Sequence, residues 1–235
     1  MLNTTMQTPK SFCILPWISL ESTAAGWVKP CCMYNINMTD ENNQPFNLNN
    51  NTLNEAWDSE YYNNLRQDFL NGKTPKGCTR CWSEEASGKT SKRIRDNARF
   101  KHHITEDIIK NPKIKYLDLK LGNICNLKCR ICGPYSSSQM ALELIKQYPK
   151  ELQKSNEIYK MQQAGQWPRK QKKFWNNLAP YLNKISFIEF TGGEPFMIKE
   201  HFEFLQKLEN KSEIEIHYNT NGTQYPDKYI DIWKD

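Results

Sequence analysis

The sequence predicts an α/β protein that contains part of a (β/α) barrel, preceded by a small cysteine-rich α+β region. From residue 113 onward, strand and helix patterns alternate, as they do in parallel βαβ units. This alternation gives three βα units, whereas a closed barrel takes about eight strands. The predicted regions are therefore a first domain over 10–100, a connector over 101–112 and a truncated barrel over 113–235.

The first region combines a hairpin, a polar loop and a helix. The stretch "LESTAAGWVKPCC" predicts a hairpin with Gly26 near its turn. Residues 37–51 are rich in Asn and predict a loop. Thr52 and Glu55 form a capping box that begins a helix, and Gly72 is a suitable end for it. Residues 83–111 are predicted to form a mostly helical connection.

Three strands are predicted in the second region, within "KIKYLDLKLGN", "KISFIEFTGGEP" and "EIEIHYNTNGT". Strand side chains alternate, so each strand has an apolar face and a mixed or polar one. One hypothesis is that the polar faces line an open substrate cavity, with Lys120, Glu189 and His217 as candidate contacts. The alternative is that these side chains form structural Lys–Glu pairs or face solvent.

Composition favours a folded protein in a reducing compartment. Hydrophobic residues make up 38% and charged residues 25% of the chain. The net charge of +6 is mild, and Lys-rich segments such as 146–173 are explained by a solvated helical face, so nucleic acid is weakly supported as a partner. The N-terminus lacks a signal pattern, and no stretch has the length of a membrane span. We therefore expect a cytoplasmic protein whose cysteines bind metal rather than form disulfides.

Three cysteines follow the first of these strands, in "GNICNLKCRIC". Cys125, Cys129 and Cys132 are spaced Cys-x3-Cys-x2-Cys. Three thiolates on one loop can hold three irons of a [4Fe–4S] cluster and leave the fourth iron open to a small molecule. Structural zinc is the alternative, and it needs a fourth ligand that is missing nearby.

The chain resembles the radical S-adenosylmethionine (radical SAM) enzymes through "CNLKCRIC" after the first predicted strand and "TGGEP" after the second. In that family the open iron is chelated by S-adenosylmethionine (SAM). Reductive cleavage of SAM then yields a 5′-deoxyadenosyl radical, which takes hydrogen from a substrate. The resemblance implies that Cys125, Cys129 and Cys132 are the cluster ligands.

The same resemblance implies further cofactor contacts. Ile131 would lie against adenine, and the segment Gly192, Gly193, Glu194 and Pro195 would contact the methionine amino group. Glycines let the backbone approach a ligand closely, and carbonyls with the Glu194 carboxylate can accept from an ammonium. Asn219 and Asn221 in "NTNGT" resemble the segment after the family's third strand, although a plain Asn-Gly turn explains them equally well.

The earlier cysteines resemble the auxiliary-cluster domains called SPASM or twitch. Cys13, Cys31, Cys78 and Cys81 match the pattern of a hairpin and a distant Cys-x2-Cys loop, with Cys31 and Cys32 open alternatives for one ligand. Four thiolates would ligate every iron of a second cluster, which we expect to be [4Fe–4S], although zinc would accept the same four ligands. In most relatives this domain follows the core, whereas here it precedes it.

We therefore expect a radical SAM enzyme that uses an external electron donor. Relatives with such auxiliary domains often modify peptides or small proteins, so the expected substrate is a peptide or protein. Two alternatives belong to other classes of protein. One is a non-catalytic iron–sulfur electron-transfer or cluster-carrier protein, and the other is a zinc-stabilised interaction module. The missing later strands imply either a fragment or completion by a partner.

Overall fold

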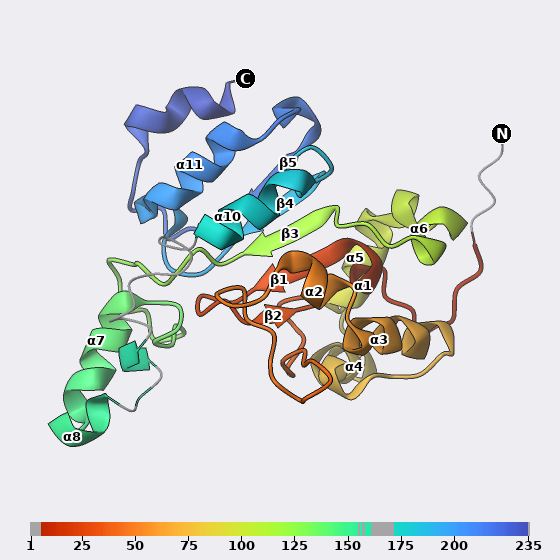
Figure 1. Ribbon diagram of the computed structural model, residues 1–235, viewed down its shortest axis with the longest axis horizontal. Coiled ribbons are helices and arrows are strands. Elements are labelled where there is room, and N and C mark those ends of the chain that lie inside the picture. Colours follow the sequence, from red (N-terminus) through yellow and green to blue (C-terminus); the bar gives the residue numbers. More distant parts are fainter. Residues whose placement is uncertain (1–5, 155, 157, 161–171, 235) are drawn as a thin grey trace.

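A five-stranded sheet lies at the centre of the computed structural model, which describes residues 6–154, 156, 158–160 and 172–234 (Figure 1). The strands lie in the order β2-β1-β3-β4-β5. Their bounds are β1 Ser19–Ser22, β2 Val28–Lys29, β3 Tyr116–Leu119, β4 Phe187–Phe190 and β5 Glu215–Tyr218. β1 is antiparallel to β2, and all other neighbours are parallel. The protein is thus α/β with a mostly parallel sheet, while its relation to a barrel stays a prediction.

The sheet joins the two regions of the chain. The predicted hairpin is present as β1 and β2, and Gly26 in its turn has φ +86°. β1 also pairs along its other edge with β3, where Leu20 lies opposite Leu117. The sequence predicts the hairpin but not this second pairing, because the two strands are far apart in the chain. The first region therefore extends the sheet that the second region forms.

Strand alternation follows the prediction. Leu117 pairs with Ile188 and Leu119 with Phe190 on the apolar face, and all four are buried. α10 (Lys172–Leu178) and α11 (Lys199–Lys207) cover this face, with the Phe204 ring of α11 5.8 Å from that of Phe190 (Figure 1).

The other face is also covered over β3 and β4. Phe100 packs at ring distances of 5.6 Å from Tyr116 and 5.5 Å from Phe187. It directly follows α5 (Lys92–Arg99), whose Lys92 donates a hydrogen bond to the Tyr116 hydroxyl. Burial of these side chains excludes the solvent-facing alternative for β3 and β4. On β5, by contrast, Glu215 and His217 are exposed.

The helix predicted after Thr52 is two helices. The capping box is present, with Glu55 N donating to Thr52 Oγ1 and Thr52 N to the Glu55 carboxylate. α2 (Leu53–Trp57) then stops, and Ser59 caps α3 (Glu60–Leu70) by accepting from Tyr62 N. Apolar residues still recur every four positions across this break. Two short helices in succession can bury the same side as a single long helix.

The remaining elements connect and cover the sheet. In chain order they are α1 Leu15–Ile18, η1 Lys76–Cys78, α4 Thr79–Ala86, η2 Lys101–His103, α6 Glu106–Lys110, α7 Ser138–Gln147, α8 Lys150–Gln153, η3 Ala179–Tyr181, η4 Pro195–Met197, η5 Lys211–Glu213 and η6 Asp227–Trp233. In the Lys-rich segment 146–173, residues 155, 157 and 161–171 lie outside the described residues. The last element, η6, is a 3-10 helix that directly follows Pro226.

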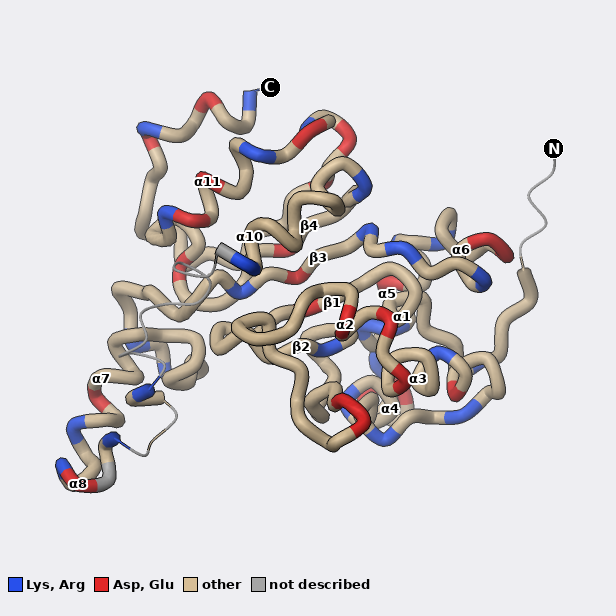
Figure 2. The backbone as a smooth tube through the Cα atoms, viewed as in Figure 1, with Lys and Arg blue, Asp and Glu red and all other residues tan. Residues whose placement is uncertain are grey.

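One apolar core spans both regions. Buried side chains from Phe12 to Leu208 form a single contiguous cluster that includes Leu20 and Leu117. Lys and Arg are interspersed with Asp and Glu over both halves of the molecule (Figure 2). None of the helices within the described ranges combines the length and the apolar character that a membrane span requires.

Candidate functional site

The cysteine loop leaves the carboxyl end of β3 and leads into α7. Cys125 is buried, Cys132 is half-buried and Cys129 is exposed. Cys132 N donates to the Cys129 carbonyl at 3.0 Å. Burial raises the pKa of the Cys132 thiol, and Cys129 and Cys125 raise it further by their negative charge when ionised. The three cysteines are thus close enough to act on one another electrostatically.

Two N–H groups point at the sulfur of Cys125. Leu127 N lies 3.4 Å from it, and Asn221 Nδ2 lies 3.6 Å from it. Asn221 Nδ2 also donates to Asn126 Oδ1 at 3.1 Å, so the turn after β5 contacts the cysteine loop. Hydrogen bonds to cluster sulfurs are one determinant of a cluster's reduction potential. The structure therefore brings Asn221 to the cysteines, which a plain Asn-Gly turn would not require.

The two glycines after β4 pack against the cysteine loop. Gly192 and Gly193 have φ of +77° and +53°, a region that favours glycine. A Cβ on Gly193 would lie 2.9 Å from the carbonyl carbon of Asn123 and 3.0 Å from Ile124 N. The adjacent Glu194 N donates to the Ile124 carbonyl at 2.6 Å. The glycines thus permit a backbone contact between the two loops.

The Glu194 side chain forms hydrogen bonds within the chain. Its carboxylate is fully buried and accepts hydrogen bonds from Thr220 Oγ1 at 2.8 Å, Asn221 N at 2.7 Å and Phe196 N at 3.1 Å. A buried carboxylate requires such partners. Contact of this carboxylate with a ligand's ammonium stays a prediction, and in this structure its hydrogen bonds come from the chain itself. Pro195 is buried at the start of η4, and contacts from the backbone of this loop to SAM stay a prediction.

Two other predicted cofactor contacts lie in different surroundings. Ile131 is 97% exposed beside Cys132, so its side chain is accessible to a flat apolar group. Asn219 points toward the sheet and donates through Nδ2 to Glu189 Oε1 at 3.2 Å. Asn219 therefore contacts the polar face of the sheet, whereas Asn221 contacts the cysteine loop.

The N-terminal cysteines converge on one small cavity. Its lining includes Cys13, Cys31, Cys78 and Cys81. Cys32 is exposed instead, and its charged neighbours include Asp118 and Lys92. The structure thus brings together the predicted set that contains Cys31.

The model of the radical SAM superfamily matches residues 119–235, which begin at the end of β3 and include the cysteine loop. The model of the iron–sulfur cluster-binding domain SPASM matches residues 13–82, which contain all four cysteines of the cavity. The chain belongs to the radical SAM superfamily. It also carries an auxiliary SPASM domain. Searches among curated proteins and among solved structures gave no match.

Radical SAM membership implies a [4Fe–4S] cluster and SAM as cofactors, and the SPASM domain supports an auxiliary cluster. The donor sets fit these groups, with three thiols on one loop and four around one cavity. The fit is one of residue type and location, because within the described residues no three His, Cys, Asp or Glu side chains are placed to share a single metal ion.

Burial favours the protonated form of three SPASM cysteines, Cys13, Cys31 and Cys78. It raises the pKa of Cys78 to about 12, and it also raises the pKa values of Cys13 and Cys31. These groups are thiols in the metal-free chain at neutral pH. Because thiolate is the ligand form, iron binding at this cavity must release protons.

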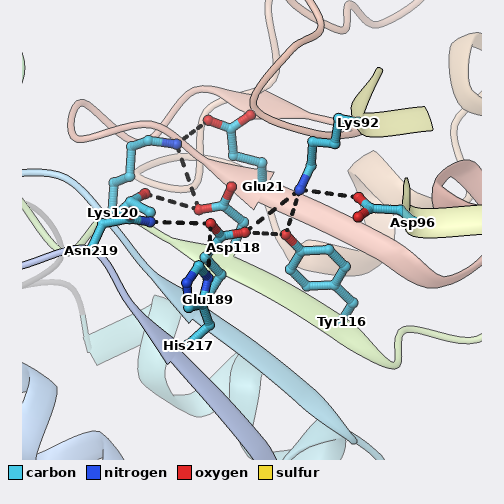
Figure 3. A network of polar contacts seen from close by, with 10 residues as sticks. Glu21, Lys92, Asp96, Tyr116, Asp118, Lys120, Glu189, His217 and Asn219 are labelled. Atoms are coloured by element: carbon cyan, nitrogen blue, oxygen red, sulfur yellow. Dashed lines mark hydrogen bonds and ion pairs between the residues drawn. The ribbon is translucent and has the colours of Figure 1, made fainter. Parts of the chain in front are cut away.

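Polar side chains form a row across the sheet of this radical SAM protein (Figure 3). Pairing places Glu21 opposite Asp118, Asp118 opposite Glu189, and Glu189 opposite His217. Lys120 forms ion pairs with Glu21 and Asp118. Parallel register thus gathers three carboxylates and one imidazole from four strands.

Helix α5 contributes to the same network. The ammonium of Lys92 lies 3.1 Å from the Asp96 carboxylate, 3.1 Å from the Tyr116 hydroxyl and 3.7 Å from the Glu189 carboxylate. The Tyr116 hydroxyl donates to Glu189. The first region therefore contributes the ammonium of Lys92 and the carboxylates of Glu21 and Asp96 to the polar face of the sheet.

The three candidate substrate contacts differ in their ion pairs and in their exposure to solvent. Lys120 and Glu189 are held in ion pairs, as the structural-pair alternative expects, and their side chains are 19% and 12% exposed. His217 is 52% exposed, with Nδ1 3.4 Å from Glu189 Oε1. A direct contact with substrate stays a prediction for all three, and His217 is the most accessible of them.

Local sequence patterns do not indicate the role of several members of the network. Glu21 lies in the stretch that predicts the hairpin, and Lys92 and Asp96 lie in the helical connection predicted over 83–111. The spacing of Lys92 and Asp96 by four residues is an ordinary helical ion-pair signal. Their position over the sheet depends on the packing of α5, which the local sequence pattern does not encode.

Proposed function

We propose that this chain uses a [4Fe–4S] cluster on Cys125, Cys129 and Cys132 to cleave SAM reductively. An external donor supplies one electron, the sulfonium carbon–sulfur bond breaks, and methionine and a 5′-deoxyadenosyl radical result. The radical removes a hydrogen atom from the substrate and becomes 5′-deoxyadenosine. The observation that carries the proposal is the three-cysteine loop in contact with the glycine loop and with Asn221, within the matched segment.

The chain's own groups would each have a role in this reaction. The exposed Ile131 offers apolar contact to adenine, and Leu127 N and Asn221 Nδ2 donate toward the Cys125 sulfur. Gly192 and Gly193 bring the backbone near the cysteine loop, where their carbonyls could accept from the methionine ammonium. Glu194 fixes this loop to the turn after β5.

We further propose that the sheet is the beginning of a (β/α) barrel, with the SPASM region as a twitch-like domain that carries the second cluster. β5 lies at one end of the strand order, and its exposed polar face would be covered by further strands or by a partner. The proposed substrate is a peptide or protein, a class that the SPASM resemblance favours.

The test is anaerobic reconstitution with iron and sulfide, followed by reduction and electron paramagnetic resonance with and without SAM. We expect a cluster signal that SAM changes, and formation of 5′-deoxyadenosine that Cys129→Ala reduces to background. Cys32→Ala is the matched control and should retain cleavage, since Cys32 lies outside the three-cysteine loop and is not among the cysteines that line the SPASM cavity.

The other classes of protein predict different outcomes. A spectrum indifferent to SAM would favour an electron-transfer or cluster-carrier protein. Two zinc ions per chain with no iron would favour a zinc-stabilised interaction module. Cleavage of SAM that survives Cys129→Ala would contradict the proposed ligand set.

A further inference from the structure

Helix α5 lies beyond the segment that matches SPASM, yet it forms one wall of the SPASM cysteine cavity. The matched segment ends at residue 82, and α5 begins at Lys92. Lys92 and Arg93 both line the cavity together with the four cysteines. Ser91 caps the helix by accepting from Ile94 N. The first turn of α5 is therefore fixed in place beside the cysteines.

Cys13 is held through its two neighbours in the chain. Arg93 Nη1 donates to the Phe12 carbonyl at 2.8 Å, and Asn97 Nδ2 donates to the same oxygen at 2.8 Å. On the other side of the cysteine, Ile14 N donates to Asn97 Oδ1 at 2.8 Å. Two residues one helical turn apart on α5 thus fix the backbone on both sides of Cys13.

Arg93 also reaches the other end of the cysteine set. Its guanidinium carbon lies 4.9 Å from the centre of the Trp82 ring, next to Cys81. Its Nε donates to Glu85 Oε1 on α4 at 2.9 Å, and α4 carries Cys81 in its first turn. The side chain is largely buried. One planar cation therefore connects the segment of Cys13 with the helix of Cys81.

The position of this cation has an electrostatic consequence. Uptake of one electron adds a negative charge to a centre that four thiolates already make negative. A buried cation beside the cavity stabilises the added charge, because a protein interior screens weakly. Glu85 opposes this effect, since its carboxylate pairs with the same guanidinium.

We propose that Arg93 is a positioning residue of the auxiliary cluster that also raises the cluster's reduction potential, with Glu85 as the opposing charge. This proposal rests on the auxiliary cluster that the SPASM match supports. Arg93 sets the separation between Cys13 and Cys81 through its hydrogen bonds, and its charge favours the reduced state. Lysine would keep the charge and lose the planar set of donors.

The experiment isolates the auxiliary cluster in the full chain. Cys125, Cys129 and Cys132 are all replaced by Ala, the protein is reconstituted, and the iron content and the midpoint potential are measured by a titration monitored by paramagnetic resonance. Arg93→Met should lower the iron content and shift the midpoint to more negative values. Glu85→Gln should shift it to more positive values. Arg95→Met, which removes an exposed cation from the same helix, should leave it unchanged.

The two substitutions shift the potential in opposite directions, which a merely structural role does not explain. If Arg93→Met fails to fold, the sign of the Glu85→Gln shift decides alone. The proposal is overturned if Arg93→Met binds iron with an unchanged midpoint potential. It is also overturned if the midpoint potential of Glu85→Gln shifts to more negative values or does not shift. A bound cluster that accepts no electron would also overturn it. Absence of iron in the parent triple variant would instead overturn the auxiliary cluster itself.

Discussion

At the residue scale, Gly193 illustrates how close approach dictates residue type. Its backbone is left-handed, and a side chain there would meet the backbone of Asn123 and Ile124. A family resemblance assigns this glycine to cofactor contact. The structure adds a packing reason, since the loop after β4 could not contact the cysteine loop with a larger residue.

Gly193→Ala should therefore reduce both stability and cofactor use. The left-handed backbone alone costs an alanine about 1–2 kcal/mol, and displacement of the cysteine loop adds to that cost. We expect a lower midpoint of thermal unfolding and a weakened effect of SAM on the cluster's resonance spectrum. Gly88→Ala is a useful control, because Gly88 also has positive φ but no atom lies near its would-be Cβ. Equal loss of the SAM effect in both variants would contradict the argument.

Asp118 has the most strongly shifted pKa among the carboxyl groups of the polar row. Burial, with Glu21 and Glu189 adding to it, raises the pKa of Asp118 to about 7, although Lys120 and Lys92 act in the opposite direction. Its Oδ2 is buried without a hydrogen-bond partner among the described residues. The charged form is thus less favourable in the folded chain than in the unfolded chain.

The sign of the pH dependence follows from this raised pKa. The contribution of Asp118 to stability is greatest below its ordinary pKa of about 3.9 and is lost as the pH rises toward about 7. Unfolding by denaturant between these limits should show the wild type losing stability relative to Asp118→Asn. Asp231→Asn, at an exposed site, serves as the control. A pH-independent difference between wild type and Asp118→Asn would refute the assignment.

At the element scale, Glu194 joins two loops that follow adjacent parallel strands. The carboxyl ends of β4 and β5 lie at the same edge of the sheet, so their loops meet there. The Glu194 carboxylate accepts from Thr220 and Asn221, and Asn221 in turn contacts Cys125. The position of the turn after β5 therefore depends on a side chain from the loop before α11.

Glu194→Gln should loosen that turn. The amide replaces an accepting oxygen with a donor that faces other donors, and hydrogen bonds to charged groups contribute about 1.5–3 kcal/mol. We expect faster amide hydrogen exchange over 219–223 and a lower unfolding midpoint. Glu209→Gln, at an exposed position, should change neither. Unchanged exchange in Glu194→Gln would show that the turn holds its position by other contacts.

At the scale of the whole molecule, the two cysteine sites belong to one sheet and one core. β1 of the SPASM segment pairs with β3, and the apolar cluster is continuous from Phe12 to Leu208. The polar row and α5 add ion pairs between the same two parts. The distance between the two predicted clusters is thus fixed by shared secondary structure rather than by a linker.

Leu20→Ala tests this coupling. Leu20 is fully buried on β1 opposite Leu117, and removal of a buried leucine side chain costs about 2–5 kcal/mol. We expect the amides of β4 to lose protection together with those of β1 in hydrogen exchange under mild denaturant. Leu142→Ala, at a site 46% exposed, should have little effect. Loss of protection confined to β1 and β2 would instead mean that the two regions unfold separately.

The sequence by itself determined the superfamily to which this chain belongs and its candidate cysteine ligands. Cysteine spacing and the glycine motif indicated the radical SAM and SPASM segments, and strand alternation indicated the buried faces. The radical SAM motifs and the alternation are local signals. Tertiary structure decided what local patterns do not encode. It paired β1 with β3, turned Glu194 inward, selected Cys31 over Cys32 for the cavity and placed α5 over the sheet. Each of these depends on contacts between residues far apart in the chain, where register and packing of the whole core fix the outcome.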